Sequence, residues 1–146
     1  MNNTKFHGVT SLTLVAIASL IGLIVMARSS WMWSGIYLAV IITASQIILR
    51  TYCAKCPCKA HCGHIFPGKI ASAFAKDGPY IRTDFLILGV SVLLLIGLPQ
   101  FWLWHAPRMF VAYWILTGIA LVQIRLVICP NCSNVYCPMR VKTQQQ

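Results

Sequence analysis

Acidic side chains are almost absent from this chain of 146 residues, which has no glutamate and two aspartates, Asp77 and Asp84, against 12 lysines and arginines. Catalysis by paired carboxylates and metal sites built from carboxylates are therefore nearly excluded. The chain also lacks a phosphate-binding glycine loop and a serine nucleophile elbow. No Cys-x-x-Cys-His sequence occurs, so covalent haem attachment is not indicated. These absences leave thiols and imidazoles as the groups that could carry chemistry.

Charge is missing from most of the chain, because charged residues make up 10% of it, whereas about 25% is usual in soluble domains. Four apolar stretches account for this, at residues 9–27, 31–50, 85–103 and 109–128. At ~1.5 Å rise per residue, each spans the ~30 Å hydrocarbon layer as a helix, which satisfies its own backbone. The sequence predicts an all-α integral membrane protein, with a single four-helix membrane domain over residues 1–146.

The net charge of +10 indicates membrane topology rather than nucleic-acid binding. Arg28 and Arg108 lie on one side of the predicted membrane, and ten basic residues lie on the other: Lys5, Arg50, Lys55, Lys59, Lys69, Lys76, Arg82, Arg125, Arg140 and Lys142. The positive-inside rule places both termini in the cytoplasm, in a plasma (inner) membrane. The first stretch exceeds the ~7–15 apolar residues of a signal peptide, so we expect it to be retained.

All seven cysteines lie in two polar segments, residues 53–64 and 129–138, which this topology places in the cytoplasm. The first holds Cys53, Cys56, Cys58 and Cys62 with His61 and His64, and the second holds Cys129, Cys132 and Cys137. In a reducing compartment, paired cysteines indicate metal ligands or redox thiols rather than structural disulfides. Four nearby cations favour thiolate over thiol, namely Arg50, Lys55, Lys59 and Arg125.

Two Cys-x-x-Cys pairs, Cys53–Cys56 and Cys129–Cys132, predict a four-thiolate site. A second set of four would use Cys58, Cys62 and Cys137 with His61 or His64, so that eight ligands serve two tetrahedral sites. Zinc and an iron–sulfur cluster both remain open. The first segment reads C-x2-C-x1-C-x3-C, one residue shorter than the bacterial ferredoxin run.

A weak internal repeat predicts that the four helices form two hairpins. Gln46-Ile47 and Gln123-Ile124 each stand shortly before a Cys-x-x-Cys pair. We expect the hairpins to be related by a pseudo-two-fold axis along the membrane normal. Between them, residues after Pro67 form either a short interfacial helix or a loop over the metal site. His105 is expected to be a hydrogen-bonding histidine at the opposite interface.

These sequence patterns specify the fold more closely than they specify the function. The favoured interpretation is a membrane metalloprotein that serves as a structural or electron-transfer subunit, with the lipid bilayer, a partner membrane subunit or a cytoplasmic redox protein as partners. A soft-metal carrier, a membrane thiol-disulfide oxidoreductase and a non-catalytic assembly subunit are the alternatives. Catalytic activity and association into homo-oligomers stay open.

Overall fold

Four long apolar helices dominate the structure, a computed structural model that describes residues 3–56, 65–74 and 79–130. They are α1 (Asn3–Ser29), α2 (Trp31–Thr51), α4 (Arg82–Gly97) with its continuation α5 (Gln100–Leu103), and α6 (Pro107–Gln123) with its continuation η3 (Ile124–Ile128). Within the described ranges, these are the four segments long and apolar enough to cross a membrane. The predicted all-α membrane architecture is confirmed at this level.

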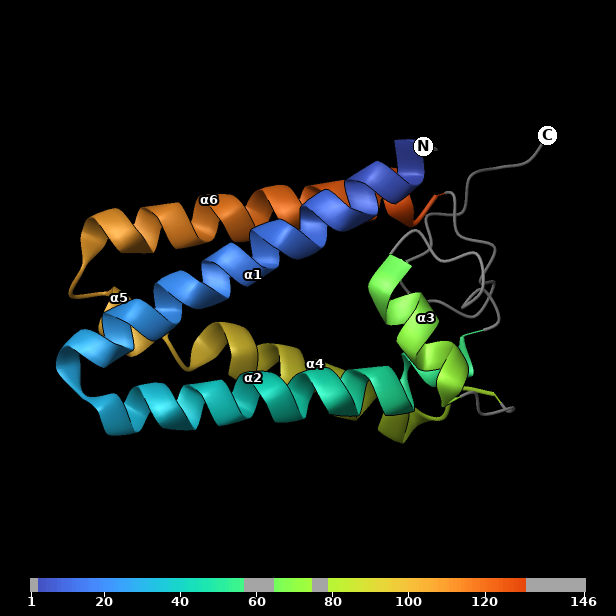
Figure 1. The fold of residues 1–146 in the computed structure, drawn as a ribbon, viewed down its shortest axis with the longest axis horizontal. Coiled ribbons are helices and arrows are strands. Elements are labelled where there is room, and N and C mark those ends of the chain that lie inside the picture. The colour runs from blue at the N-terminus through green and yellow to red at the C-terminus, as the bar shows by residue number, and fades with distance from the viewer. Residues whose placement is uncertain (1–2, 57–64, 75–78, 131–146) are drawn as a thin grey trace.

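The helices pack in two pairs that are bridged by α1 (Figure 1). Helix α1 lies against α6 and also against α2, and α2 lies against α4. The first predicted hairpin is therefore a packed pair, turned at Ser30. In the second, α4 lies beside α2 and α6 beside α1, and hydrogen bonds join α4 and α5 to α6 near the turn between them.

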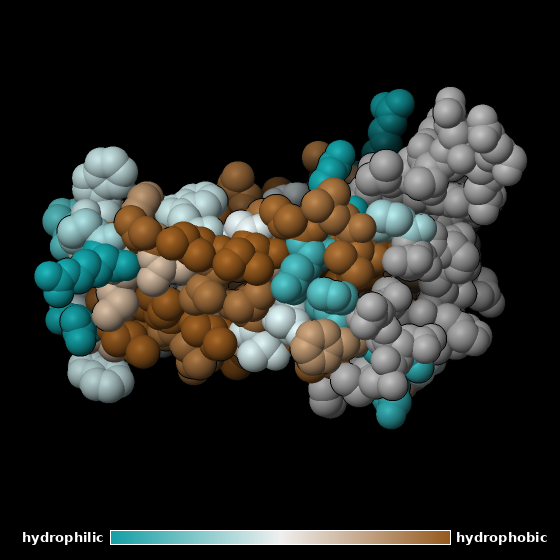
Figure 2. All heavy atoms as spheres, turned by 90° about the horizontal axis from the view of Figure 1, so that it is seen from above, coloured by the Kyte–Doolittle hydropathy of each residue, from teal (hydrophilic) through white to brown (hydrophobic). Residues whose placement is uncertain are grey.

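The long axis of the molecule has two chemically distinct ends (Figure 2). Apolar residues form a band across the middle, and hydrophilic and weakly polar residues gather at the end with the α1–α2 turn. We call this the aromatic end, since it carries Trp31, Trp33, Phe101, Trp102 and Trp104. The opposite end, which we call the cysteine end, carries Cys53, Cys56 and Cys129.

The helices differ from the predicted stretches in several places, and three of these differences have clear physical reasons. Helix α1 begins at Asn3 rather than residue 9, because hydropathy marks the part in the membrane and a helix can extend into water. The stretch 85–103 is interrupted after Gly97, because Pro99 has no N–H to continue the helix. The last turn of the stretch 109–128 widens into η3, a π-helix in which Cys129 N–H donates to the Ile124 carbonyl at 2.8 Å.

The interruption at Pro99 leaves the Leu95 carbonyl without its helical donor, four residues before the proline. Two tyrosine hydroxyls from other helices approach this oxygen, Tyr37 of α2 at 2.9 Å and Tyr113 of α6 at 3.5 Å. Both tyrosine side chains are buried. Since an unpaired carbonyl is costly in the apolar layer, this contact fastens three helices together.

Gly22 allows α1 to pack closely against the break in α4. A Cβ atom built on Gly22 of α1 would lie 3.1 Å from Tyr37 Cε1 and 3.2 Å from Pro99 Cβ. Both distances are tighter than ordinary van der Waals contact, so glycine permits the close approach of α1 to the tyrosine and the proline. All four long helices therefore meet around the break in α4.

We expect Tyr37→Phe to destabilise the protein by about 1 kcal/mol, because hydrogen bonds between membrane helices contribute roughly 0.6 and at most about 1.7 kcal/mol. Titration of helix content with SDS in mixed micelles measures the loss. Tyr113→Phe is the matched variant, and its longer contact of 3.5 Å predicts a smaller effect. Equal losses in the two variants, or none in Tyr37→Phe, would contradict the assignment.

Helix α3 (Ile65–Ala73) crosses the cysteine end of the bundle and contacts η1, α2 and α1 (Figure 1). The helical alternative for this segment is therefore confirmed, although the helix begins before Pro67, which the first turn tolerates. Ala71 is fully buried, whereas Ile70 and Phe74 are exposed. The exposed apolar pair fits a helix that lies at the membrane interface.

Candidate functional site

Two of the predicted ligands sit on one tight turn directly after α2. Residues Cys53–Lys55 form the 3₁₀ turn η1, and Cys56 N–H donates to the Cys53 carbonyl at 3.1 Å. Side chains three residues apart in a 3₁₀ turn lie on the same side. Both cysteines are half-buried. The structure thus carries both cysteines on one element, a single 3₁₀ turn apart.

Cys129, the third described cysteine, follows η3 at the same end of the molecule (Figure 1). It is buried, and η3 packs against α1. Six further predicted ligands lie outside the described residues: Cys58, Cys62, Cys132, Cys137, His61 and His64. Each predicted four-ligand set needs at least one of these six.

Among the residues that the structure describes, no three His, Cys, Asp or Glu side chains gather in one place. Cys53 and Cys56 are the two predicted ligands that it brings together on one element. The composite four-thiolate site and the second set therefore stay predictions.

A largely buried ion pair connects the cysteine turn to the start of α4. Lys55 Nζ lies 2.7 Å from Asp84 Oδ2, and the two side chains are 17% and 7% exposed. Asp84 Oδ2 also accepts the Ile81 N–H at 3.0 Å and so caps α4. Lys55 was predicted to be one of the cations that favour thiolate, and the structure pairs its ammonium with Asp84. The sequence feature that could have indicated this pair is Asp84, a carboxylate directly before the apolar stretch 85–103.

Arg50, the second of the four cations near the thiols, is engaged with an aromatic ring. Its guanidinium carbon lies 5.1 Å from the ring centroid of Phe74, just after α3, which is a cation–π distance. Arg125 is exposed, and Lys59 lies outside the described residues. The positive charge at this end therefore serves partly to join α2 to α3 and η1 to α4.

An aromatic cluster supports the cysteine turn from the other side. The rings of Tyr52 and Tyr80 have centroids 4.9 Å apart, and Phe85 lies 6.2 Å and 5.7 Å from them. Tyr80 Oη also donates to the Tyr52 carbonyl at 3.3 Å. Because Tyr52 immediately precedes Cys53, these contacts and the ion pair hold the turn on α4. If Cys53 and Cys56 bind a metal, contacts that hold their turn in this way would pre-organise the two ligands.

Two polar side-chain atoms near this end are buried and have no hydrogen-bond partner among the described residues, His7 Nδ1 on α1 and Gln123 Oε1 at the end of α6. Gln46, the repeat counterpart of Gln123, is exposed instead. The two halves of the predicted repeat therefore place their glutamines in different surroundings. The sequence contained no signal for this difference.

His105 fulfils its predicted role at the aromatic end, where its Nδ1 lies 3.0 Å from the Phe101 carbonyl oxygen. It lies with α5 at the end opposite to the cysteines, so it belongs to a different region of the molecule (Figure 1). Comparison of the chain with protein-family models, curated proteins and solved structures gave no match.

Proposed function

We propose that this protein is a small integral membrane metalloprotein whose cysteine end lies in the cytoplasm and binds zinc or an iron–sulfur cluster. In this proposal it acts as a structural or electron-transfer subunit of the membrane. The observation that carries it is the Cys53–Cys56 turn, which the buried Lys55–Asp84 pair and the Tyr52 cluster hold in place.

The donor set suits a soft or borderline metal better than a hard one. Thiolates select zinc and iron–sulfur clusters, whereas magnesium and calcium prefer oxygen ligands. Asp84 is the one carboxylate among the described residues, and Lys55 and the Ile81 N–H already engage it. Cys53, Cys56 and Cys129 would hold the metal, together with predicted ligands from the segments 57–64 and 131–138.

The chain itself would contribute position and rigidity. Cys53 and Cys56 follow α2, and Cys129 follows η3, so a shared site would join the two helix pairs at the cysteine end. When bound, zinc would supply a structural link without redox chemistry, and an iron–sulfur cluster would supply one-electron transfer. The ion pair and aromatic cluster would hold the turn in its binding geometry before metal arrives.

The carrier alternative is less well supported, because several polar groups in the described membrane helices donate to backbone carbonyls. Tyr37 donates to Leu95, Ser19 to Val15 at 2.9 Å and Thr43 to Ala39 at 2.7 Å. The cysteines described by the structure all lie at one end. A path of ion ligands across the apolar layer is therefore not apparent in these segments.

Metal analysis with an absorption spectrum, on protein purified without oxygen in mild detergent, tests the proposal. Zinc at one or two ions per chain in a colourless solution would support a structural role. Iron with acid-labile sulfide and visible absorption would support electron transfer. Protein without metal, whose thiols alkylate rapidly, would overturn the proposal and favour a carrier or a thiol-disulfide oxidoreductase.

A further inference from the structure

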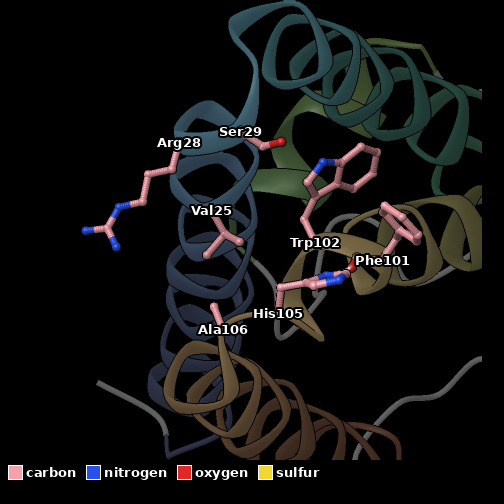
Figure 3. A pocket seen from close by; sticks show the side chains of 7 residues that line it. All are labelled: Val25, Arg28, Ser29, Phe101, Trp102, His105 and Ala106. Carbon is pink, nitrogen blue, oxygen red and sulfur yellow. Dashed lines mark hydrogen bonds between the residues drawn. The ribbon is translucent and has the colours of Figure 1, made fainter.

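We propose that the cavity at the aromatic end binds the hydroxylated aromatic head of a membrane-soluble amphiphile, a ligand of the quinol class. The cavity has a volume of about 440 Å³, within the range of roughly 300–1,000 Å³ usual for small-molecule sites. The last turn of α1 lines one side, and α5 with the residues after it lines the other (Figure 3). This site lies at the opposite end from the cysteines and is independent of the proposed metal site.

Aromatic rings form a wall suited to a flat ligand. Phe101 and Trp102 lie edge to face, with ring centroids 5.3 Å apart, and Trp33 packs on Trp102, also at 5.3 Å. Trp102 is therefore held between a neighbour on its own helix and one on α2. Val25, which is buried, contributes an aliphatic surface to the cavity. A planar aromatic head gains stacking and apolar contact in such a space.

The tautomer of His105 follows from its hydrogen bond. The Phe101 carbonyl can only accept, so the neutral imidazole must carry its proton on Nδ1, which lies 3.0 Å from that oxygen. Nε2 then keeps a lone pair and can accept a hydrogen bond. His105 lines the cavity, and the Ser29 hydroxyl points toward Trp102 (Figure 3). A phenolic hydroxyl can donate to Nε2, and Ser29 can serve a second hydroxyl.

The placement of charge argues against a lipid phosphate as the ligand. Arg28 lines the rim, but its guanidinium points away from the cavity (Figure 3). The site also lies at the aromatic end, which borders the apolar band (Figure 2), so an amphiphile can keep its chain in lipid while its head enters the cavity.

Equilibrium binding of decylubiquinol to the full chain in detergent micelles, by titration calorimetry under reducing conditions, tests this assignment. We expect His105→Ala to raise Kd about tenfold, the effect of one lost hydrogen bond of about 1.4 kcal/mol. His105→Gln keeps an acceptor oxygen and should recover part of the affinity. Oxidised decylubiquinone should bind more weakly, because its carbonyl oxygens cannot donate to Nε2.

A control variant separates this site from general partition into the micelle. Trp104→Ala removes a ring at the same end that is 75% exposed and does not line the cavity, so Kd should stay unchanged. Equal affinity in the parent protein and in a folded His105→Ala variant would overturn the proposal. So would competition by dihexanoyl phosphatidylglycerol that Arg28→Ala abolishes, since this would identify a phosphate site.

Discussion

Replacing Cys53 and Cys56 together by serine is expected to remove most of the bound metal and to lower the thermal unfolding midpoint strongly. The metal is expected to bind the folded chain much better than the unfolded chain, so its binding free energy adds to the free energy of unfolding. For structural zinc in peptides this amounts to roughly 10–16 kcal/mol, so even a partial loss should destabilise by several kcal/mol. Metal content per chain and melting by circular dichroism measure the two effects on one sample.

A variant that is destabilised elsewhere provides the control for this experiment. Tyr37→Phe weakens helix packing near Pro99 and leaves every cysteine in place, so it should melt earlier with its metal content intact. Loss of metal in both variants would mean that any destabilisation releases it. Full metal content with unchanged melting in the double serine variant would contradict the involvement of this turn.

The membrane helices could be predicted because apolar length alone specifies them, but their breaks depend on details of packing. Pro99 is visible in the sequence, yet hydropathy continues across it to Leu103. The structure shows that the helix can break there because Tyr37 and Tyr113 come from other helices to the Leu95 carbonyl. Such a contact joins residues 58 positions apart, which no local pattern reveals.

In the candidate site, likewise, the local pattern could be predicted and the long-range contacts could not. Spacing placed Cys53 and Cys56 on one turn, because Cys-x-x-Cys is a local pattern, and topology placed Cys129 at the same end. The partner of Lys55 was not predictable from spacing, since Asp84 lies 29 residues away at the start of another helix. The positive-inside rule counted Lys55 as one of many surface cations, and burial gives it a more specific role.

Asp84→Asn is expected to destabilise the protein by about 3 kcal/mol, at the lower end of the range for breaking a buried ion pair. An asparagine oxygen can still accept the Ile81 N–H, so the cap of α4 is largely kept. The Lys55 ammonium loses its counter-charge, and because its side chain is 17% exposed it can turn partly toward water. SDS titration of helix content measures the change. Arg82→Ala, which removes an exposed charge from the same turn, should have little effect.

The double variant Lys55→Met, Asp84→Asn distinguishes an unpaired charge from a general loss of structure. Methionine removes the buried ammonium and keeps much of the side-chain volume, so stability should largely return. The cysteine turn should not recover with the stability if the ion pair is what holds it on α4. Asp84→Asn should then speed alkylation of Cys53 and Cys56, and the double variant should keep fast alkylation, because both lack the link to α4. Recovery of stability without recovery of thiol protection would show that the pair positions the turn. Slow alkylation in every variant would show that the Tyr52 cluster suffices to hold it.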